Sequence, residues 1–277
     1  MDNLIFGTAS ITSVREYSRA IELLDLAYDL GIRHFDTAPL YGKGFSEVIL
    51  GKFIKYKRLD ICVSTKFGLG GTWLPSFLPV KLALALKNSY NQESSLSENV
   101  PNRLPVYKEL NNNWITRRQV KKSLENSLKR LGTDYIDYYF LHEGNFSSLS
   151  EGAVDFLQQK KQEGLILNIG LASNVNSILE QSKSGLDFWD TLQYEWESKT
   201  GSSKYLLEMF PNKAHFHHSC LRNWRDFDFP EIADEDKGGY LLARCKAINP
   251  HGKLIFSTTS KTRLKNNIIS MKKFDIK

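Results

Sequence analysis

Four side chains that could together move a proton occur in the first half of the chain, each at or just after the end of an apolar run. They are Asp36 in "IRHFD", Tyr41 in "APLYGKG", Lys66 in "DICVSTK" and His142 in "YYFLH". A lysine ammonium beside a phenol is expected to lower the phenol pKa from about 10 by roughly one to three units. An aspartate would hold that lysine in place, and a histidine would donate a hydrogen bond to a carbonyl oxygen. These residue types therefore indicate reduction of a carbonyl, where a developing alkoxide must be protonated.

Each of these residues has a plainer explanation when it is taken singly. Asp36 could cap a loop, Lys66 could be a solvated strand end, and His142 could be a core histidine with satisfied hydrogen bonds. The functional interpretation rests on their shared position at the C-terminal ends of predicted strands, where barrel enzymes build their active sites. Three further polar residues have the same position: Ser173, Asn174 and Gln193.

The elements that must position these side chains alternate between strands and helices. Eight strands are predicted, at residues 3–7, 32–36, 60–66, 135–142, 165–173, 189–195, 214–219 and 253–258. Helices are predicted between them, one of which begins with the capping-box spacing of Thr116 and Gln119 and stops at Gly132. Eight such repeats favour a closed (β/α)8 TIM barrel of the α/β class. The first turn, "FGTAS", lacks the GxGxxG pattern of a dinucleotide-binding open sheet.

One segment interrupts this alternation. From about residue 67 to 114 the third strand is separated from its helix, although such loops normally have about two to six residues. We expect residues 1–277 to form one barrel domain in which 67–114 is a long βα-loop insertion. A lid or substrate loop and a surface excursion are both compatible with this pattern.

Composition narrows the function classes. The 37 basic and 31 acidic residues give a net charge of 37 − 31 = +6 without a concentrated basic stripe, so nucleic-acid binding is disfavoured. The three cysteines are widely spaced, and we expect no disulfide framework and a cytoplasmic location. No membrane span or signal peptide is expected. No metal site is expected either, because His215, His217 and His218 have no matching carboxylates.

These residues resemble the aldo-keto reductase family. The likeness is carried by "FGTAS", "GIRHFDTAPLYGKGFSEVILG", "VSTKFG", "VKKSLENSLKRLGTDYIDYYFLH", "EGLILNIGLASN" and "LIFSTTSKTRLKNNI", in the family's order. It implies a barrel that binds NADPH in extended form, with Tyr41 as the proton donor. It also implies that Asp36, Tyr41, Lys66 and His142 act together, and this set is called the tetrad below.

The resemblance also implies a cofactor site. Ser173, Asn174 and Gln193 match the family residues that hold the nicotinamide carboxamide, while Arg263 and Asn267 match those on the adenosine side. An arginine suits a 2′-phosphate, so NADPH is expected in preference to NADH. The remaining expected contacts come from the ends of the first, seventh and eighth strands: Gly7, Thr8, His218, Ser257, Thr258 and Thr259.

The chain departs from the family pattern near its C-terminal end. A histidine stands where an aromatic usually stacks on the nicotinamide, and it is His218 or alternatively His217. Ser257 stands where many members have glycine or lysine, and Asn266 stands where many have glutamate. The loop at 222–232 is shorter than is usual in the family. We expect Trp73, Phe77 and Trp224 to line the substrate pocket.

The sequence thus predicts an NADPH-dependent carbonyl reductase of small molecules, a monomer or weak dimer. The alternative is an NADP(H)-binding sensor or partner subunit with little or no turnover.

Overall fold

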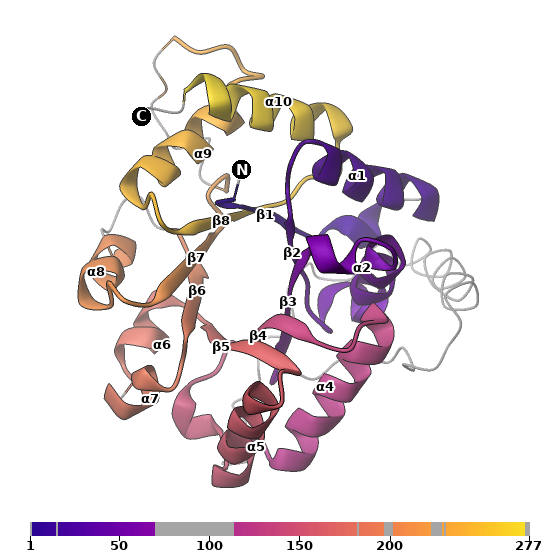
Figure 1. The fold of residues 1–277 in the computed structure, drawn as a ribbon. Coiled ribbons are helices and arrows are strands. Elements are labelled where there is room, and N and C mark those ends of the chain that lie inside the picture. Colours follow the sequence, from indigo (N-terminus) through magenta and orange to yellow (C-terminus); the bar gives the residue numbers. More distant parts are fainter. Residues whose placement is uncertain are drawn as a thin grey trace, which may run out of the picture.

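Eight parallel strands close into a barrel in sequence order, with helices around it (Figure 1). This computed structural model describes residues 2–14, 16–69, 114–181, 183–196, 202–222, 229 and 231–274. The strands are β1 Leu4–Gly7, β2 His34–Asp36, β3 Cys62–Phe67, β4 Ile136–His142, β5 Ile166–Ala172, β6 Thr191–Glu195, β7 Ala214–His218 and β8 Lys253–Phe256. β1 pairs with β8 and closes the ring, with Ile5 opposite Ile255. The predicted (β/α)8 barrel is confirmed, and all eight predicted strands overlap those observed.

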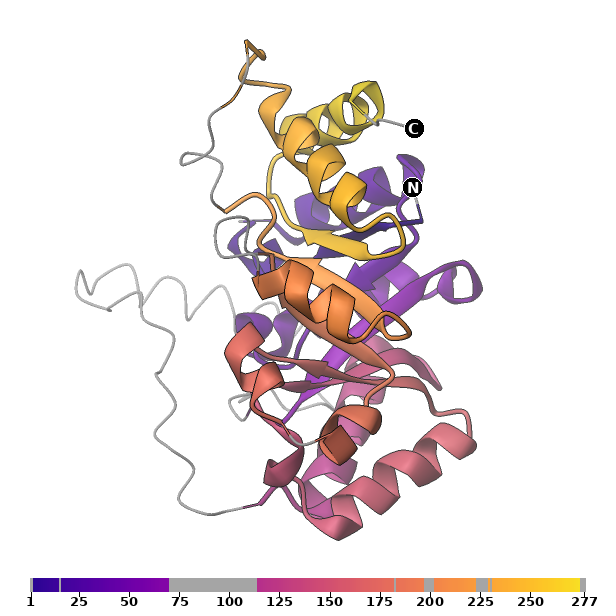
Figure 2. The same cartoon turned by 90° about the vertical axis from the view of Figure 1, so that its left-hand side faces the viewer.

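The outer layer consists of helices between the strands. They are α1 Tyr17–Asp29, α2 Phe45–Ile54, α4 Arg117–Leu131, α5 Glu151–Gln162, α6 Val175–Leu179, α7 Lys183–Asp187, α8 Ser202–Met209, α9 Lys237–Ile248 and α10 Lys261–Lys273. Seen from the side, α9 and α10 lie at the opposite end of the molecule from α4 and α5 (Figure 2). The capping box at the start of α4 is present, and Gly132 ends this helix with φ 62°.

The interruption predicted at 67–114 follows β3. This strand ends at Phe67, and α4 begins at Arg117. Residues 70–113 lie outside the described residues, so the insertion and the one-domain organisation stay predictions.

The barrel interior is filled by a small apolar cluster. Ile5, Phe140, Ala172, Phe216 and Ile255 are buried together inside the ring of strands. Side chains alternate across a strand. The residues two positions after Phe140 on β4 and two positions after Phe216 on β7 therefore also face inward, at the C-terminal end of the barrel. This end, with the loops that follow the strands, is called the rim below. The apolar cluster is its floor.

A buried ion pair joins α2, α4 and β3. Arg130 Nε donates to Glu47 Oε2 at 2.6 Å, and the hydroxyl of Thr65 donates to Glu47 Oε1 at 2.7 Å. Both charged side chains are almost fully buried, with 3% of Arg130 and 0% of Glu47 exposed. Thr65 precedes Lys66, so the pair holds the strand that carries the tetrad lysine.

Replacing Arg130 by alanine should destabilise the fold severely. Glu47 would remain as an unpaired buried charge, which costs about 3–5 kcal/mol of unfolding free energy. The matched control is Lys121→Ala, since Lys121 and Glu125 form an exposed pair on α4 at 3.9 Å and such pairs contribute at most about 1 kcal/mol. Urea unfolding measures both. Similar small losses in the two variants would contradict the assigned role.

The outer face of β7 carries two buried histidines. Tyr194 Oη donates to His215 Nδ1 at 2.9 Å, and His215 Nε2 donates to the carbonyl of Phe210 at 2.8 Å. The side-chain amide of Asn249 donates to His217 Nε2 at 2.9 Å. His217 is 0% exposed, and burial lowers its pKa to about 3, with His215 and His218 adding to the effect.

This burial predicts a loss of stability on acidification. A histidine in the unfolded chain has a pKa near 6.5 and becomes protonated below that pH. Folded His217 stays neutral down to about pH 3, so acidification between these two values favours the unfolded chain. Between pH 7 and pH 5 the wild type should lose about 2 kcal/mol more unfolding free energy than His217→Gln, whose amide oxygen can still accept from Asn249. Urea unfolding at pH 7, 6 and 5 tests this. Parallel pH curves for the two proteins would refute it.

Candidate active site

A buried ion pair lies at the rim between β2 and β3. Lys66 Nζ donates to both carboxylate oxygens of Asp36, at 2.8 and 2.7 Å, and to the carbonyl of Thr37 at 2.9 Å. Burial has the largest single effect on the pKa of Lys66 and lowers it, but the charges of Asp36 and Tyr41 and the hydrogen bonds to Asp36 together outweigh burial, and the pKa is raised. Burial raises the pKa of Asp36, against the effect of the ammonium. Lys66 is therefore a fixed, charged ammonium.

Tyr41 reaches this pair from the loop after β2. Lys66 Nζ lies 4.9 Å from the centroid of the Tyr41 ring. The chain turns back directly after the tyrosine through Gly42, Lys43 and Gly44, with φ values of 54°, 56° and 98°. A Cβ on Gly42 would come within 2.3 Å of Thr12, so the glycine permits both the φ and the close approach. The glycines around Tyr41 therefore serve the turn that places it.

The expectation of a lowered Tyr41 pKa is wrong for this structure. Burial raises the pKa of Tyr41, and Asp36 and Glu143 add to the rise, while Lys66 opposes it. Burial prevails because the phenolate is the form that loses hydration. The Tyr41 hydroxyl thus holds its proton at neutral pH.

Three buried hydroxyls fix the loop that carries Tyr41. Thr8 Oγ1 donates to the carbonyl of Asp36 at 3.0 Å and lies 2.6 Å from Ser46 Oγ. Ser46 Oγ lies in turn 2.9 Å from Thr37 Oγ1. Thr8 is 0% exposed and its side chain supports the loop, so its cofactor contact stays a prediction. Gly7 is the last residue of β1 and is buried. A Cβ atom at this position would contact the side chains of Ile255 and Ser257.

His142 and His218 lie at the rim above the apolar floor. The rings of Tyr41 and His142 are perpendicular, with centroids 6.1 Å apart. Burial, with Lys66 and His218, lowers the pKa of His142 to about 3; burial, with Lys66 and Arg222, lowers that of His218 to about 4. Both imidazoles are neutral near pH 7. Two histidines were candidates for stacking on the nicotinamide. His218 lies two residues after Phe216 and faces inward with it, whereas His217 packs outward against Tyr194 and Trp196, so His218 is the candidate that lies at the rim.

The three residues predicted to hold the nicotinamide carboxamide differ in which of their hydrogen-bonding atoms are still available to a cofactor. The Oε1 atom of Gln193 is buried without a partner among the described residues. Ser173 is 3% exposed beside it, and its backbone N–H donates to the Gln193 carbonyl at 3.0 Å. Asn174 is exposed and caps α6, accepting from Ser177 N at 2.9 Å. Gln193 thus has an acceptor to offer, while the Asn174 amide already serves a helix.

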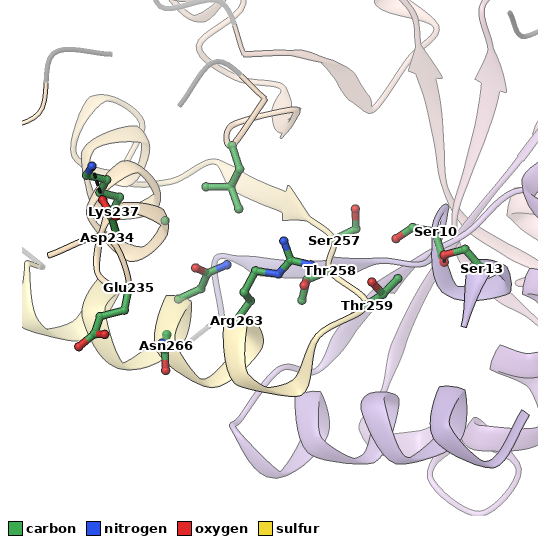
Figure 3. Close-up of a pocket in the computed structure, with 13 residues that line it drawn as sticks. Ser10, Ser13, Asp234, Glu235, Lys237, Ser257, Thr258, Thr259, Arg263 and Asn266 are labelled. Carbon is green, nitrogen blue, oxygen red and sulfur yellow. Dashed lines mark hydrogen bonds and ion pairs between the residues drawn. The ribbon is translucent and has the colours of Figure 1, made fainter. Parts of the chain in front are cut away.

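A cavity of about 540 Å³ lies between the loop after β8, the start of α9 and the loop after β1. Of the predicted adenosine-side residues it contains Ser257, Thr258, Thr259, Arg263 and Asn267, together with Asn266. In Figure 3, Arg263, Thr258 and Thr259 lie between Ser10 and Ser13 on one side and Asp234, Glu235 and Lys237 on the other.

The sequence reasoning missed several residues of this cavity: Ser10, Ser13, Leu221, Asp234, Glu235, Lys237 and Gly238. Ser10 and Ser13 follow β1 closely, and that position was a usable signal. Nothing in the sequence marked Lys237, which pairs with Asp234 at 2.5 Å.

Three residues were also predicted to line the substrate pocket. Trp73, Phe77 and Trp224 lie outside the described residues.

Within the described ranges, no group of three or more histidines, cysteines and carboxylates could hold a metal ion. Nor does this part of the chain include a helix with the length and apolar character needed to span a membrane.

Comparisons with known proteins agree with this architecture. A D-threo-aldose 1-dehydrogenase of Pseudomonas sp is 33% identical over 165 residues, or 58% of this chain and 45% of that protein. L-Galactose dehydrogenase of Arabidopsis thaliana is 30% identical over 158 residues, or 55% of this chain and 37% of that protein. The chain therefore matches less than half the length of these curated relatives.

Solved structures match over nearly the whole chain. An aldo-keto reductase from Klebsiella pneumoniae in complex with NADPH gives a TM-score of 0.66 at 17% identity, covering 98% of this chain and 85% of that one. The holo form of an aldo-keto reductase from Bacillus halodurans gives 0.65 at 20% identity, with 97% and 86% covered. These likenesses show the fold. A model of the aldo/keto reductase family matches residues 3–202, which include the whole tetrad, and the chain belongs to this family.

Proposed function

We propose that the protein is an NADPH-dependent reductase of small-molecule aldehydes or ketones, with Tyr41 as the proton donor. The observation that carries the proposal is the buried ammonium of Lys66, which Asp36 binds through both oxygens and which lies 4.9 Å from the centroid of the Tyr41 ring. A phenol beside a fixed cation can release its proton in the transition state, because the cation stabilises the phenolate that forms.

The roles of the tetrad follow from its protonation. Tyr41 keeps its proton at neutral pH and would donate it from Oη to the carbonyl oxygen of the substrate. Lys66 stays charged and would stabilise the phenolate left behind, while Asp36 prevents the lysine from moving. His142 is neutral, so one ring N–H can orient the carbonyl without adding a second charge. When bound, NADPH supplies the hydride for the carbonyl carbon.

The nicotinamide end of the cofactor fits the residues of β5 to β7. The unpartnered Oε1 of Gln193 would accept a hydrogen bond from the carboxamide NH2, since a buried acceptor without a partner is costly. Ser173 would supply a hydroxyl, and the neutral ring of His218 could stack on the nicotinamide. Asn174 would have to leave its helix cap to take part.

The adenosine end fits the cavity beside α10. Arg263 and the hydroxyls of Ser257, Thr258 and Thr259 would surround the 2′-phosphate, and Arg263 can bind it bidentately. Lys237 offers a second cation, although Asp234 already binds it. This arrangement supports NADPH over NADH.

The relatives' names support carbonyl chemistry but leave the substrate open. Two of them are named for the oxidation of sugars. Reduction of a hydroxylated aldehyde is therefore a reasonable first assay.

Tyr41→Phe should abolish turnover and leave cofactor binding in place. Loss of a positioned general acid lowers kcat by about 10²- to 10⁴-fold, while the ring and the nearby charges remain. Steady-state reduction of an aldehyde panel and NADPH titration by tryptophan fluorescence measure the two effects. An equally active Tyr41→Phe protein would contradict the assigned proton donor. NADPH binding by a wild type that reduces none of the panel would instead favour the sensor or partner-subunit alternative.

Arg263→Ala should weaken NADPH binding at least about tenfold, since a hydrogen bond to a charged group contributes roughly 1.5–3 kcal/mol. NADH lacks the 2′-phosphate, and its affinity should change much less. Fluorescence titration and the ligand-induced rise in Tm measure both cofactors without turnover. The matched control is Lys265→Ala, which removes an exposed cation of α10 that does not line the cavity. Equal losses for NADPH and NADH would refute the phosphate assignment.

A further inference from the structure

The first residue after β7 makes a contact that a continuing strand would not allow. Successive side chains of a strand point to opposite faces, so in a strand Ser219 would point away from the inward-facing His218. Instead Ser219 has a φ of 62°, in the left-handed region, and its Oγ lies 3.0 Å from Nδ1 of His218. The left-handed backbone thus returns the serine hydroxyl to the ring of the preceding histidine.

This conformation is unfavourable for a serine. Residues other than glycine that adopt it carry strain and are found disproportionately at functional sites. A glycine would adopt the same φ readily, because it has no Cβ, but it has no hydroxyl. Within the described part of the chain, the His218 ring is the one hydrogen-bond partner of the Ser219 hydroxyl. The contact with His218 is therefore what the strained serine provides and a glycine could not.

The backbone of His218 is already held by the neighbouring strand. β6 and β7 are paired with Glu195 opposite His218, and the backbone N–H of Trp196 donates to the His218 carbonyl at 2.9 Å. A fixed backbone still leaves the two side-chain torsions of a histidine to be set. The contact with Ser219 restrains both torsions, because it holds a ring nitrogen in place.

The turn that begins at Ser219 leads from the nicotinamide end of the proposed cofactor site to the adenosine cavity. The backbone N–H of Arg222 donates to the carbonyl of Ser219 at 2.9 Å, and Leu221 inside this turn lines the cavity beside α10. On the other side of His218, β6 carries Gln193 with its unpartnered Oε1. His218 thus lies between the two ends of the site, where the orientation of its ring matters.

We propose that Ser219 is a positioning residue, which holds the His218 ring through Nδ1 in the orientation that stacks on the nicotinamide. This inference rests on the proposed function, since it requires a nicotinamide at His218. A fixed ring keeps the nicotinamide in register with the substrate carbonyl, and a misplacement of about 1 Å can lower a rate by about 10²-fold. Ser219 acts through His218 and contacts neither cofactor nor substrate.

Three substitutions separate the hydroxyl from the left-handed backbone. Ser219→Ala removes the hydroxyl and keeps the unfavourable φ, whereas Ser219→Gly removes the hydroxyl and suits that φ. Ser219→Asn keeps a hydrogen-bonding side chain and tolerates the left-handed region. Both Ser219→Ala and Ser219→Gly should lower kcat for an aldehyde about tenfold, between the loss of one hydrogen bond and a full misplacement. Ser219→Asn should stay within about threefold of wild type.

A different pattern would contradict the positioning role. If the left-handed turn alone mattered, Ser219→Gly would match the wild type and only Ser219→Ala would be impaired. Steady-state kinetics on one aldehyde distinguishes the two patterns.

The His218→Phe background provides the control for the path of the effect. Phenylalanine keeps a ring that can stack but has no nitrogen for the serine to hold. Ser219→Ala should therefore change kcat less than about twofold in this background, against about tenfold in the presence of His218. Equal losses in both backgrounds would mean that the hydroxyl acts on the cofactor or substrate directly, and would overturn the proposal.

Binding measurements test the same role without turnover. NADPH carries a nicotinamide, whereas 2′-AMP carries only the adenosine and the 2′-phosphate. Ser219→Ala should weaken NADPH binding about threefold or more and leave the affinity for 2′-AMP within about twofold. The ligand-induced rise in Tm measures both. Equal weakening of the two ligands would place the defect in the adenosine cavity and refute the assignment.

These experiments separate the role of Ser219 from the proposed function. Wild-type kcat in both Ser219→Ala and Ser219→Gly, with turnover still abolished by Tyr41→Phe, would refute the role of Ser219 alone. A wild type that binds NADPH and reduces no aldehyde would overturn the reduction, while the titrations with NADPH and 2′-AMP would still decide the role of Ser219. A wild type that binds neither NADPH nor NADH would overturn both.

Discussion

The ion pair of Lys66 and Asp36 is the interaction on which the arrangement of the rim depends. Both side chains are almost fully buried, and charges without partners there would cost several kcal/mol each. The barrel meets this cost by bringing the ends of β2 and β3 together, so that both carboxylate oxygens and the Thr37 carbonyl surround the ammonium. Tyr41 and His142 can then be placed around a cation whose position is fixed.

The supports of this pair extend away from the rim in two directions. Beneath it, the hydroxyls of Thr8, Thr37 and Ser46 tie the loop after β2 to the end of β1. Behind it, Glu47 joins β3 to Arg130 of α4. Tyr41 therefore lies on a loop but is held by buried hydrogen bonds on both sides. Such bonds are strongly coupled, because removing one partner leaves a buried polar group unsatisfied.

Periodicity and strand ends made the fold predictable, while contacts between distant segments did not follow from the sequence. Buried parallel strands are continuous apolar runs, so all eight could be located and their C-terminal polar residues assigned to one rim. α6 and α7 have five residues each, too few for a helical period, so the sequence pattern located neither of them within the expected helical connection. The fully buried position of Thr8 and the meeting of Lys237 with Arg263 at one cavity depend on tertiary packing. The Tyr41 pKa was predicted in the wrong direction because burial, which raises it, cannot be read from residue types.

That raised pKa removes a difficulty with the proposed reaction. A donor must be protonated before transfer, and a phenol with a strongly lowered pKa would be partly ionised near pH 7. Here burial keeps the proton on Tyr41, and in the proposed reaction Lys66 would act on the phenolate only as it forms. The same burial keeps His142 and His218 neutral, so neither imidazole competes as an acid. Under the proposed mechanism, Tyr41 would therefore carry the transferable proton, and the ion pair would provide the charge that stabilises the phenolate when the proton leaves.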